Sequence, residues 1–130
     1  MRDQFFALAD AVTARLRGDE GFLANFRGED SHFVRFNKST VLQPGSVAQR
    51  TFALELFRGR RHASAAIALT GAQTDDVARV EAAHKSLREI LNSTEEDPFF
   101  LINTSPQSTT RAQPNRLPAP EDALDAILAA

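Results

Sequence analysis

The sequence predicts an α+β fold: an antiparallel sheet of about five strands, two main α-helices packed on it, and a short third helix near the C-terminal end. Two stretches, residues 3–17 and 74–92, carry apolar residues at helical spacing. Between them, residues 21–69 alternate with a period of two and are divided by turn-forming residues. The length of 130 residues suits one domain with one core.

The first helix is predicted over residues 3–17. Its apolar stripe consists of Phe5, Leu8, Val12 and Leu16. Gly18 follows the stripe, and Arg15 and Arg17 lie in the last predicted turn, where positive charge favours a helix end.

Five short strands are predicted over residues 22–26, 32–36, 47–57, 63–69 and 99–102. The turns between them are expected at residues 28–31, at Asn37-Lys38-Ser39, at Pro44-Gly45 and around Gly59, which can adopt the positive φ of a tight hairpin.

One face of the predicted sheet carries small residues: Ala53, Ser64, Ala66 and Ala68. A solvated face more often carries Lys, Glu and Thr, whereas small residues allow another element to approach closely. We therefore expect this face to be covered, either by a helix of this chain or by a neighbouring domain or subunit.

The second helix is predicted to begin at Thr74-Asp75-Asp76, with a capping hydroxyl and acids at the positive end of the helix dipole. Its stripe is Val77, Val80, His84, Leu87 and Leu91. These elements make residues 1–103 one α+β domain, followed by a Pro/Ser/Thr-rich linker at 104–120 and a further helix from 121 to 130. Because that helical stripe still runs at Ala130, we expect either that this helix docks on the domain or that the chain is the front part of a longer protein, and we favour the second.

Composition limits the possible functions. The net charge of −2 gives no whole-molecule argument for nucleic acid or membrane, and the absence of Cys removes thiol chemistry. Asp3 and Asp10 interrupt the first apolar run, so it is not a signal peptide, and no stretch is long enough to span a membrane. A cytoplasmic protein is expected.

No catalytic or metal motif is found. The three histidines, His32, His62 and His84, do not form an HExxH pattern, and His84 is expected in the core. There is no nucleophile elbow and no phosphate-binding glycine loop. We expect no cofactor and no catalytic residue in this chain, so the sequence does not decide whether the whole protein is an enzyme.

Residues 32–70 are locally basic, with six cations against the single acid Glu55, a balance of +5. The candidate contacts for a partner or peptide are Phe33, Arg35, Arg50, Arg58, Arg60 and Arg61. Interleaved phenylalanines also suit a nucleic-acid-binding sheet, although residues 29–32 do not fit the start of an RNA-recognition signature. The same charges would serve equally to protect sheet edges from pairing.

The segments HFVRFNKSTVLQPGSVAQRTFALELF and GRRHASAAIALTG, followed by a helix that starts TDD, resemble the amino-terminal domain of the TldD/PmbA family. The resemblance implies a relation to two-subunit zinc peptidases that degrade unfolded peptides and that have been linked to modulation of DNA gyrase. The family's zinc-binding histidine–glutamate motif belongs to a later part of the longer proteins, so zinc is implied only for them.

The resemblance therefore implies an amino-terminal interaction domain that positions a peptide, a homologous subunit or a downstream domain. The alternative is a small module that binds nucleic acid or an acidic partner through the basic strands.

Overall fold

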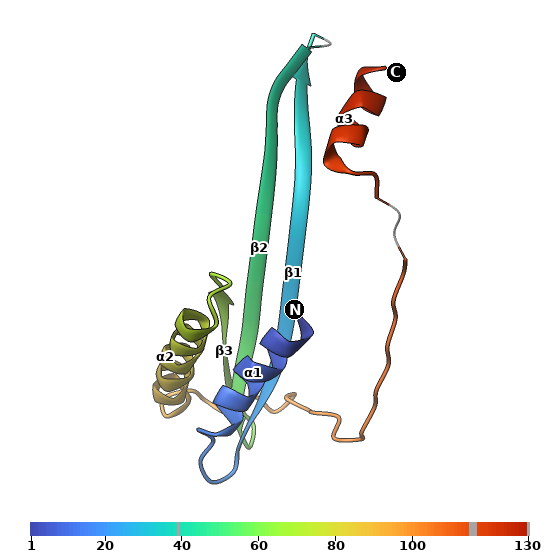
Figure 1. Cartoon of the computed structure of the whole chain (residues 1–130). Helices are drawn as coiled ribbons and strands as arrows, with labels where there is room; N and C mark the ends of the chain where they lie inside the picture. The colour runs from blue at the N-terminus through green and yellow to red at the C-terminus, as the bar shows by residue number, and fades with distance from the viewer. Residues whose placement is uncertain (39, 115–116, 130) are drawn as a thin grey trace. The chain divides into compact units, whose positions relative to one another are not determined.

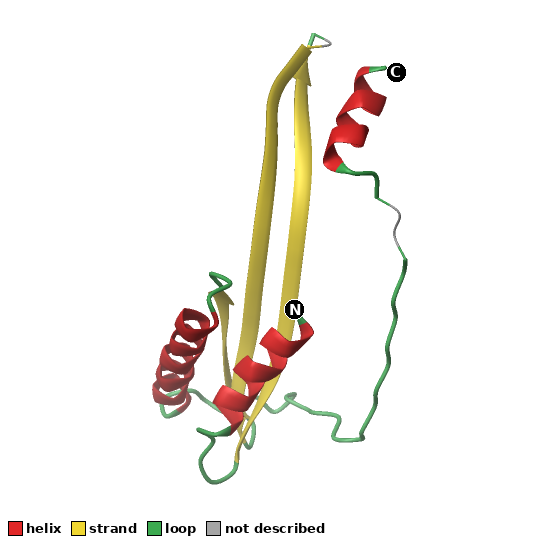
Figure 2. Ribbon diagram, in the orientation of Figure 1, coloured by secondary structure: helices red, strands yellow, loops and turns green. Residues whose placement is uncertain are grey.

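A computed structural model describes residues 1–38, 40–114 and 117–129. In chain order its elements are α1 (Arg2–Thr13), β1 (Glu20–Asn37), β2 (Thr40–Arg58), β3 (Arg61–Ala68), α2 (Gln73–Leu91) and α3 (Pro120–Leu128) (Figure 1). The α+β class is confirmed. The prediction of about five strands is wrong, because the described residues form one three-stranded sheet in the order β1-β2-β3 (Figure 2).

The chain forms two compact units, each described here by itself. Unit 1 contains residues 1–29 and 48–102, and unit 2 contains residues 30–47 and 103–130. The long strands β1 and β2 each contribute residues to both units.

The turn predicted at residues 28–31 does not exist, because β1 continues through it. Gly28 serves a packing purpose instead: a Cβ atom at this position would lie 2.9 Å from the Met1 sulfur. A glycine inside a strand often marks such a close approach rather than a turn.

The turn predicted at Pro44-Gly45 is also wrong, since β2 runs through both residues. Gly45 lies under the Phe33 ring, where a Cβ atom would clash with the ring. Pro44 is tolerated because β3 pairs only with Thr51–Arg58, which leaves β2 at Pro44 with β1 as its one neighbour. Of the turn predicted at Asn37-Lys38-Ser39, Ser39 lies outside the described residues, while Lys38 has the positive φ of a turn, 49°.

The fourth predicted turn, around Gly59, is confirmed. Gly59, with φ of 59°, connects β2 to β3, and the two strands pair antiparallel from Thr51↔Ala68 to Arg58↔Arg61. The register places Phe52, Leu54 and Leu56 on one face, opposite Ile67, Ala65 and Ala63.

The core of unit 1 lies between this face and the two helices α1 and α2. It contains Leu8 and Val12 from α1, three side chains of β2, Ile67 of β3, and Val80, Leu87 and Leu91 from α2. Phe22, Ala24 and Phe26 of β1 pack against it. Each element contributes the apolar positions that its own periodicity predicts.

Two helix boundaries and one strand differ from prediction. α1 ends at Thr13 rather than at residue 17, and residues 15 and 16 form tighter turns back to Val12 and Thr13. α2 begins at Gln73 with Ala72 as N-cap, so Thr74 does not cap it. Residues 99–102 form no strand, and Phe99 and Leu101 are 87% and 85% exposed.

The described part of the predicted linker, residues 104–114 and 117–119, contains no helix or strand. Its three prolines, Pro106, Pro114 and Pro118, and its many hydroxyl residues disfavour both strand pairing and helical turns. α3 follows at Pro120–Leu128, close to its predicted start. Residues 115, 116 and 130 lie outside the description.

Candidate functional site

A cavity of about 600 Å³ in unit 1 lies between the C-terminal end of α1 and the side of α2. Small side chains at Ala14, Ala78 and Ala82 leave the space open. Its charged or titratable lining consists of Arg15, Arg17, Glu81, His84, Lys85 and Arg88. We call this the basic cavity.

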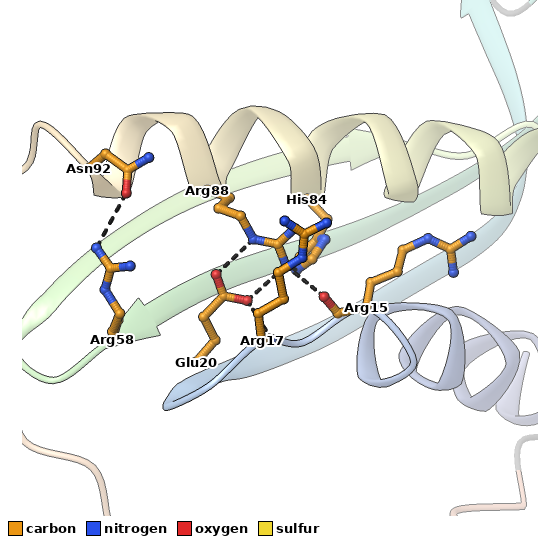
Figure 3. Close-up of polar contacts among 7 residues, drawn as sticks. All are labelled: Arg15, Arg17, Glu20, Arg58, His84, Arg88 and Asn92. Atoms are coloured by element: carbon orange, nitrogen blue, oxygen red, sulfur yellow. Dashed lines mark hydrogen bonds and ion pairs between the residues drawn. The ribbon is translucent and has the colours of Figure 1, made fainter.

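A buried ion pair borders the basic cavity (Figure 3). Arg88 donates from Nε and Nη2 to the two carboxylate oxygens of Glu20, each at 2.7 Å, and the Glu20 side chain is 3% exposed. Nη2 also donates to the Arg15 carbonyl at 2.6 Å. The hydrogen bonds from Arg88 hold the pKa of Glu20 below its usual value, and Glu20 in turn raises the pKa of Arg88. The pair fixes the chain after α1 against α2.

His84 lies beside this pair and is 1% exposed, so its predicted place in the core is confirmed. Its Nε2 lies 3.4 Å from Nη2 of Arg88. Arginine can only donate, so the contact requires an unprotonated Nε2. Burial, followed by the positive charge of Arg88, lowers the pKa of His84; Glu20 acts in the opposite direction.

The cations of the basic cavity outnumber its carboxylates. Arg15, Arg17, Lys85 and Arg88 face Glu20 and Glu81, which leaves a surplus of +2. Arg15 is paired with Glu81 at 2.6 Å. Across residues 1–38, 40–114 and 117–129, the side chains of Arg17 and Lys85 show no ion pair, and both residues are exposed.

The residues predicted as partner contacts lie elsewhere and fall into both units. In unit 1, Arg58, Arg60 and Arg61 come together around the β2–β3 turn. Arg58 donates to the Asn92 side chain at 3.3 Å, as Figure 3 shows, and Arg61 lies 3.7 Å from Glu96. The Arg60 carbonyl accepts from the Asp97 amide. This turn therefore holds the segment that follows α2.

The other predicted contacts are distributed along the long strands. Arg50 belongs to unit 1, and its carbonyl accepts from the Leu69 amide. Phe33 and Arg35 belong to unit 2, where the Arg35 guanidinium lies 5.4 Å from the Phe33 ring centre and donates to Gln43. A cation above the ring is an attractive arrangement, and it occupies one face of Phe33.

The second surface of interest is the side of the β2–β3 ladder away from α1 and α2, which we call the open face. Its cross-strand pairs are Thr51↔Ala68, Ala53↔Ala66 and Glu55↔Ser64. All four predicted small residues, Ala53, Ser64, Ala66 and Ala68, are exposed. Neither α1 nor α2 covers them, because both helices pack on the opposite face.

One end of the open face is covered by the segment after α2. The Phe100 ring stacks on His62 at 4.2 Å between ring centres and lies 5.8 Å from Phe57. His62 also contacts Glu55 at 2.7 Å and Asp97 at 3.4 Å. The remaining part of the open face, around Ala53 and Ala66, has no such cover within unit 1.

Sequence reasoning did not identify the basic cavity. Arg15 and Arg17 were recognisable only as charges near a helix end, and Arg88 lies some seventy positions later on another helix. One signal was available: Arg88 lies one helical turn after His84, a predicted core position of α2. A charged side chain beside the core needs a partner of opposite charge, so a buried ion pair could have been expected there.

The described residues contain no group of three or more His, Cys, Asp or Glu side chains placed to hold a metal ion. None of the helices in the described part of the chain is long and apolar enough to cross a membrane. Comparison with protein-family models, with curated proteins and with solved structures finds no match.

Proposed function

We propose that this chain is a protein-interaction domain without a catalytic centre of its own. Its role would resemble that of the amino-terminal domain of TldD/PmbA-type proteins: to position an unfolded peptide or a partner subunit. The observation that carries this proposal is the open face, a flat ladder of exposed small residues on an otherwise well-packed unit.

The chemistry of the open face favours contact with another polypeptide. Alanine and serine side chains add little height, so a second strand, sheet or helix can approach the backbone closely. Leu23 of β1, between the core-facing Phe22 and Ala24, points to the same side and is 43% exposed. Together with Ala53 and Ala66 it offers apolar area to a partner.

Charged residues lie at and near the turn end of the β2–β3 ladder. Arg58 is paired with Arg61 there, and Arg60 is exposed in the turn between them. By strand alternation Arg50, Arg58 and Arg61 lie on the same side of the sheet as Phe52 and Leu56, opposite to the open face. They and Arg60 remain our candidate contacts for acidic groups of a partner that extends beyond the open face, and Phe33 and Arg35 remain candidates in unit 2.

Substitution of Ala66 by Arg tests the proposal. The long side chain would stand on the open face and block close approach, while the core on the other face is untouched. Binding to unfolded β-casein is measured by fluorescence anisotropy and self-association by sedimentation. Ala66→Arg should weaken whichever interaction occurs by more than about tenfold.

The matched control is Ser86→Arg, which adds the same side chain at an exposed position of α2. The proposal would be contradicted if both variants bound β-casein or self-associated equally well. It would also be contradicted if the wild type showed neither β-casein binding nor self-association at protein concentrations of about 1 mM.

The nucleic-acid alternative is less well supported, because Arg58 and Arg61 contact side chains of their own chain and Arg35 lies over Phe33. Micromolar binding of single-stranded RNA that falls steeply with salt would nevertheless favour it over our proposal.

The family resemblance associates zinc and peptide cleavage with a later region of the longer proteins. We therefore expect this chain alone not to cleave an unfolded polypeptide. Cleavage that a chelator stops would show that the chain carries a metal centre.

A further inference from the structure

The basic cavity has properties that the proposed interaction role does not use. It lies on the side of unit 1 that carries α1 and α2, whereas the open face lies on the other side of the sheet. Its cations come from two segments, the end of α1 and the side of α2, which the Glu20–Arg88 pair holds together.

Part of this positive charge has a structural use. Arg88 directs Nε and Nη2 to Glu20, and Arg15 directs its two terminal nitrogens to Glu81 and to the Ala11 carbonyl. These contacts account for both carboxylates at the cavity. They also fix the positions of two guanidinium groups.

The remaining donors have no partner of this kind. Within the described residues, Arg17 and Lys85 make no ion pair. Nη1 of Arg88 makes no hydrogen bond there either. Two cations and the Nη1 amino group of Arg88, which has two N–H donors, therefore belong to residues that line the same space. Such donors bind phosphate and carboxylate oxygens through charge-assisted hydrogen bonds.

The cations of the basic cavity also act on the buried imidazole of His84. Burial, followed by the charges of Arg88, Arg15 and Arg17, lowers the pKa of His84, whereas the charge of Glu20 acts in the opposite direction. Three guanidinium groups near one buried ring produce a positive field, which favours an anion in the cavity beside it.

We propose that the basic cavity binds a small organic oxyanion through Arg17, Lys85 and Arg88, with a phosphate or carboxylate group as the recognised chemistry. A volume of about 600 Å³ is that of a typical small-molecule site and exceeds what one anionic group fills. Leu16, Ala78 and Ala82 provide apolar wall for the rest of such a ligand.

The test uses the full chain labelled with ¹⁵N and titrated with sodium phosphate, and separately with sodium succinate, against sodium chloride at constant ionic strength. Saturable shifts are expected at the amides of residues 14–17 and 78–88. Tighter binding of phosphate would assign the site to phosphorylated ligands, and tighter binding of succinate to carboxylates.

Arg17→Gln and Lys85→Gln should each weaken binding about tenfold, the effect of losing one charge-assisted hydrogen bond. Both residues are exposed, so the fold should persist, as dispersed amide spectra would show. Arg111→Gln is the control: it removes the same charge from an exposed position that does not line the cavity.

The proposal is overturned if neither anion gives saturable shifts beyond those of chloride, or if the two cavity variants bind as well as Arg111→Gln does. It is independent of the proposed interaction role, because Ala66→Arg should leave anion binding unchanged.

Discussion

Asp76 is the most completely hydrogen-bonded side chain of the core and carries no exposed surface. Its carboxylate accepts from the Thr70 amide and hydroxyl, the Gly71 amide and the Gln4 side chain, at 2.6 to 3.0 Å. Burial alone would raise its pKa, but these hydrogen bonds outweigh burial and the pKa lies below the usual value. Asp76 thereby connects the segment before α2 to α1.

Asp76→Asn should destabilise the protein by about 1–3 kcal/mol, because the amide presents N–H groups to donors that need an acceptor. Asp75→Asn is the matched control, since Asp75 is exposed in the same helical turn and should change stability by less than about 0.5 kcal/mol. Urea unfolding measures both. Equal losses would show that the Asp76 network contributes nothing specific.

His84 should make stability depend on pH. Its pKa is lowered in the folded state, so near neutral pH the unfolded chain binds more protons than the folded one. The stability that results is present above the unfolded pKa of about 6.5 and is lost as pH falls below it. The wild type should therefore lose more stability between pH 7.5 and 5.5 than His84→Gln does.

The measurement is urea unfolding of both proteins at the two pH values, with the His84 ring followed by NMR. The difference isolates His84 from His32 and His62. A ring that titrates at or above pH 6.5 in the folded protein would contradict the prediction.

At the scale of elements, β2 shows how one strand serves two surfaces. Leu54 is 1% exposed in the core, whereas its neighbour Ala53 is exposed on the open face. Leu54→Ala should cost about 2–5 kcal/mol through lost burial and a cavity. Ala53→Ser should cost less than about 0.5 kcal/mol. Chemical denaturation checks the contrast, and a large loss for Ala53→Ser would mean that the open face is covered in solution.

The predictability of each element follows from its local signals. α2 agrees with its prediction to within a residue at each end, because its apolar stripe is regular, with Asp75 and Asp76 in the first turn and Asn92 at the end; only the cap differs, since Thr74 lies inside the helix. The predicted division into shorter strands is wrong, because Gly28 and Gly45 lie inside β1 and β2 and form no turn. Each makes room for a distant side chain, Met1 or Phe33, and no local pattern records that contact. Residues 99–102 are apolar enough for a buried strand, but the segment adds no strand to the sheet and only Phe100 packs against it, on Phe57 and His62.

The candidate sites show the same limit. The open face was predictable, since strand alternation assigns Ala53 of β2 to one side of the sheet and Ser64, Ala66 and Ala68 of β3 to one side of their strand. The packing of both α1 and α2 on the opposite side of the sheet was not predictable, because it depends on contacts between residues distant in the sequence. The basic cavity was not predictable, since it is lined by residues that are far apart in the sequence, such as Arg17 and Arg88.

At the scale of the whole molecule, the core belongs entirely to unit 1. Every core residue, from Leu8 to Leu91, lies within residues 1–29 or 48–102. Unit 2 contributes local contacts of its own, such as His32 with Ser46 and Arg35 with Gln43, which share one strand register. Hydrophobic burial is the main stabilising contribution in a domain of this size, so unit 1 should fold without unit 2.

A shortened chain tests this. Residues 31–47 are replaced by Asn-Gly, which forms the tight turn that two antiparallel strands need, and the chain ends at Ile102. Because no core side chain is removed, the shortened chain should unfold cooperatively with a Tm within about 5 °C of the full chain. Calorimetry and amide spectra give the answer. A chain with poorly dispersed amides would show that residues outside unit 1 stabilise its core.

Retained phosphate binding by the shortened chain would locate the anion site within unit 1, since every residue that lines the basic cavity is kept.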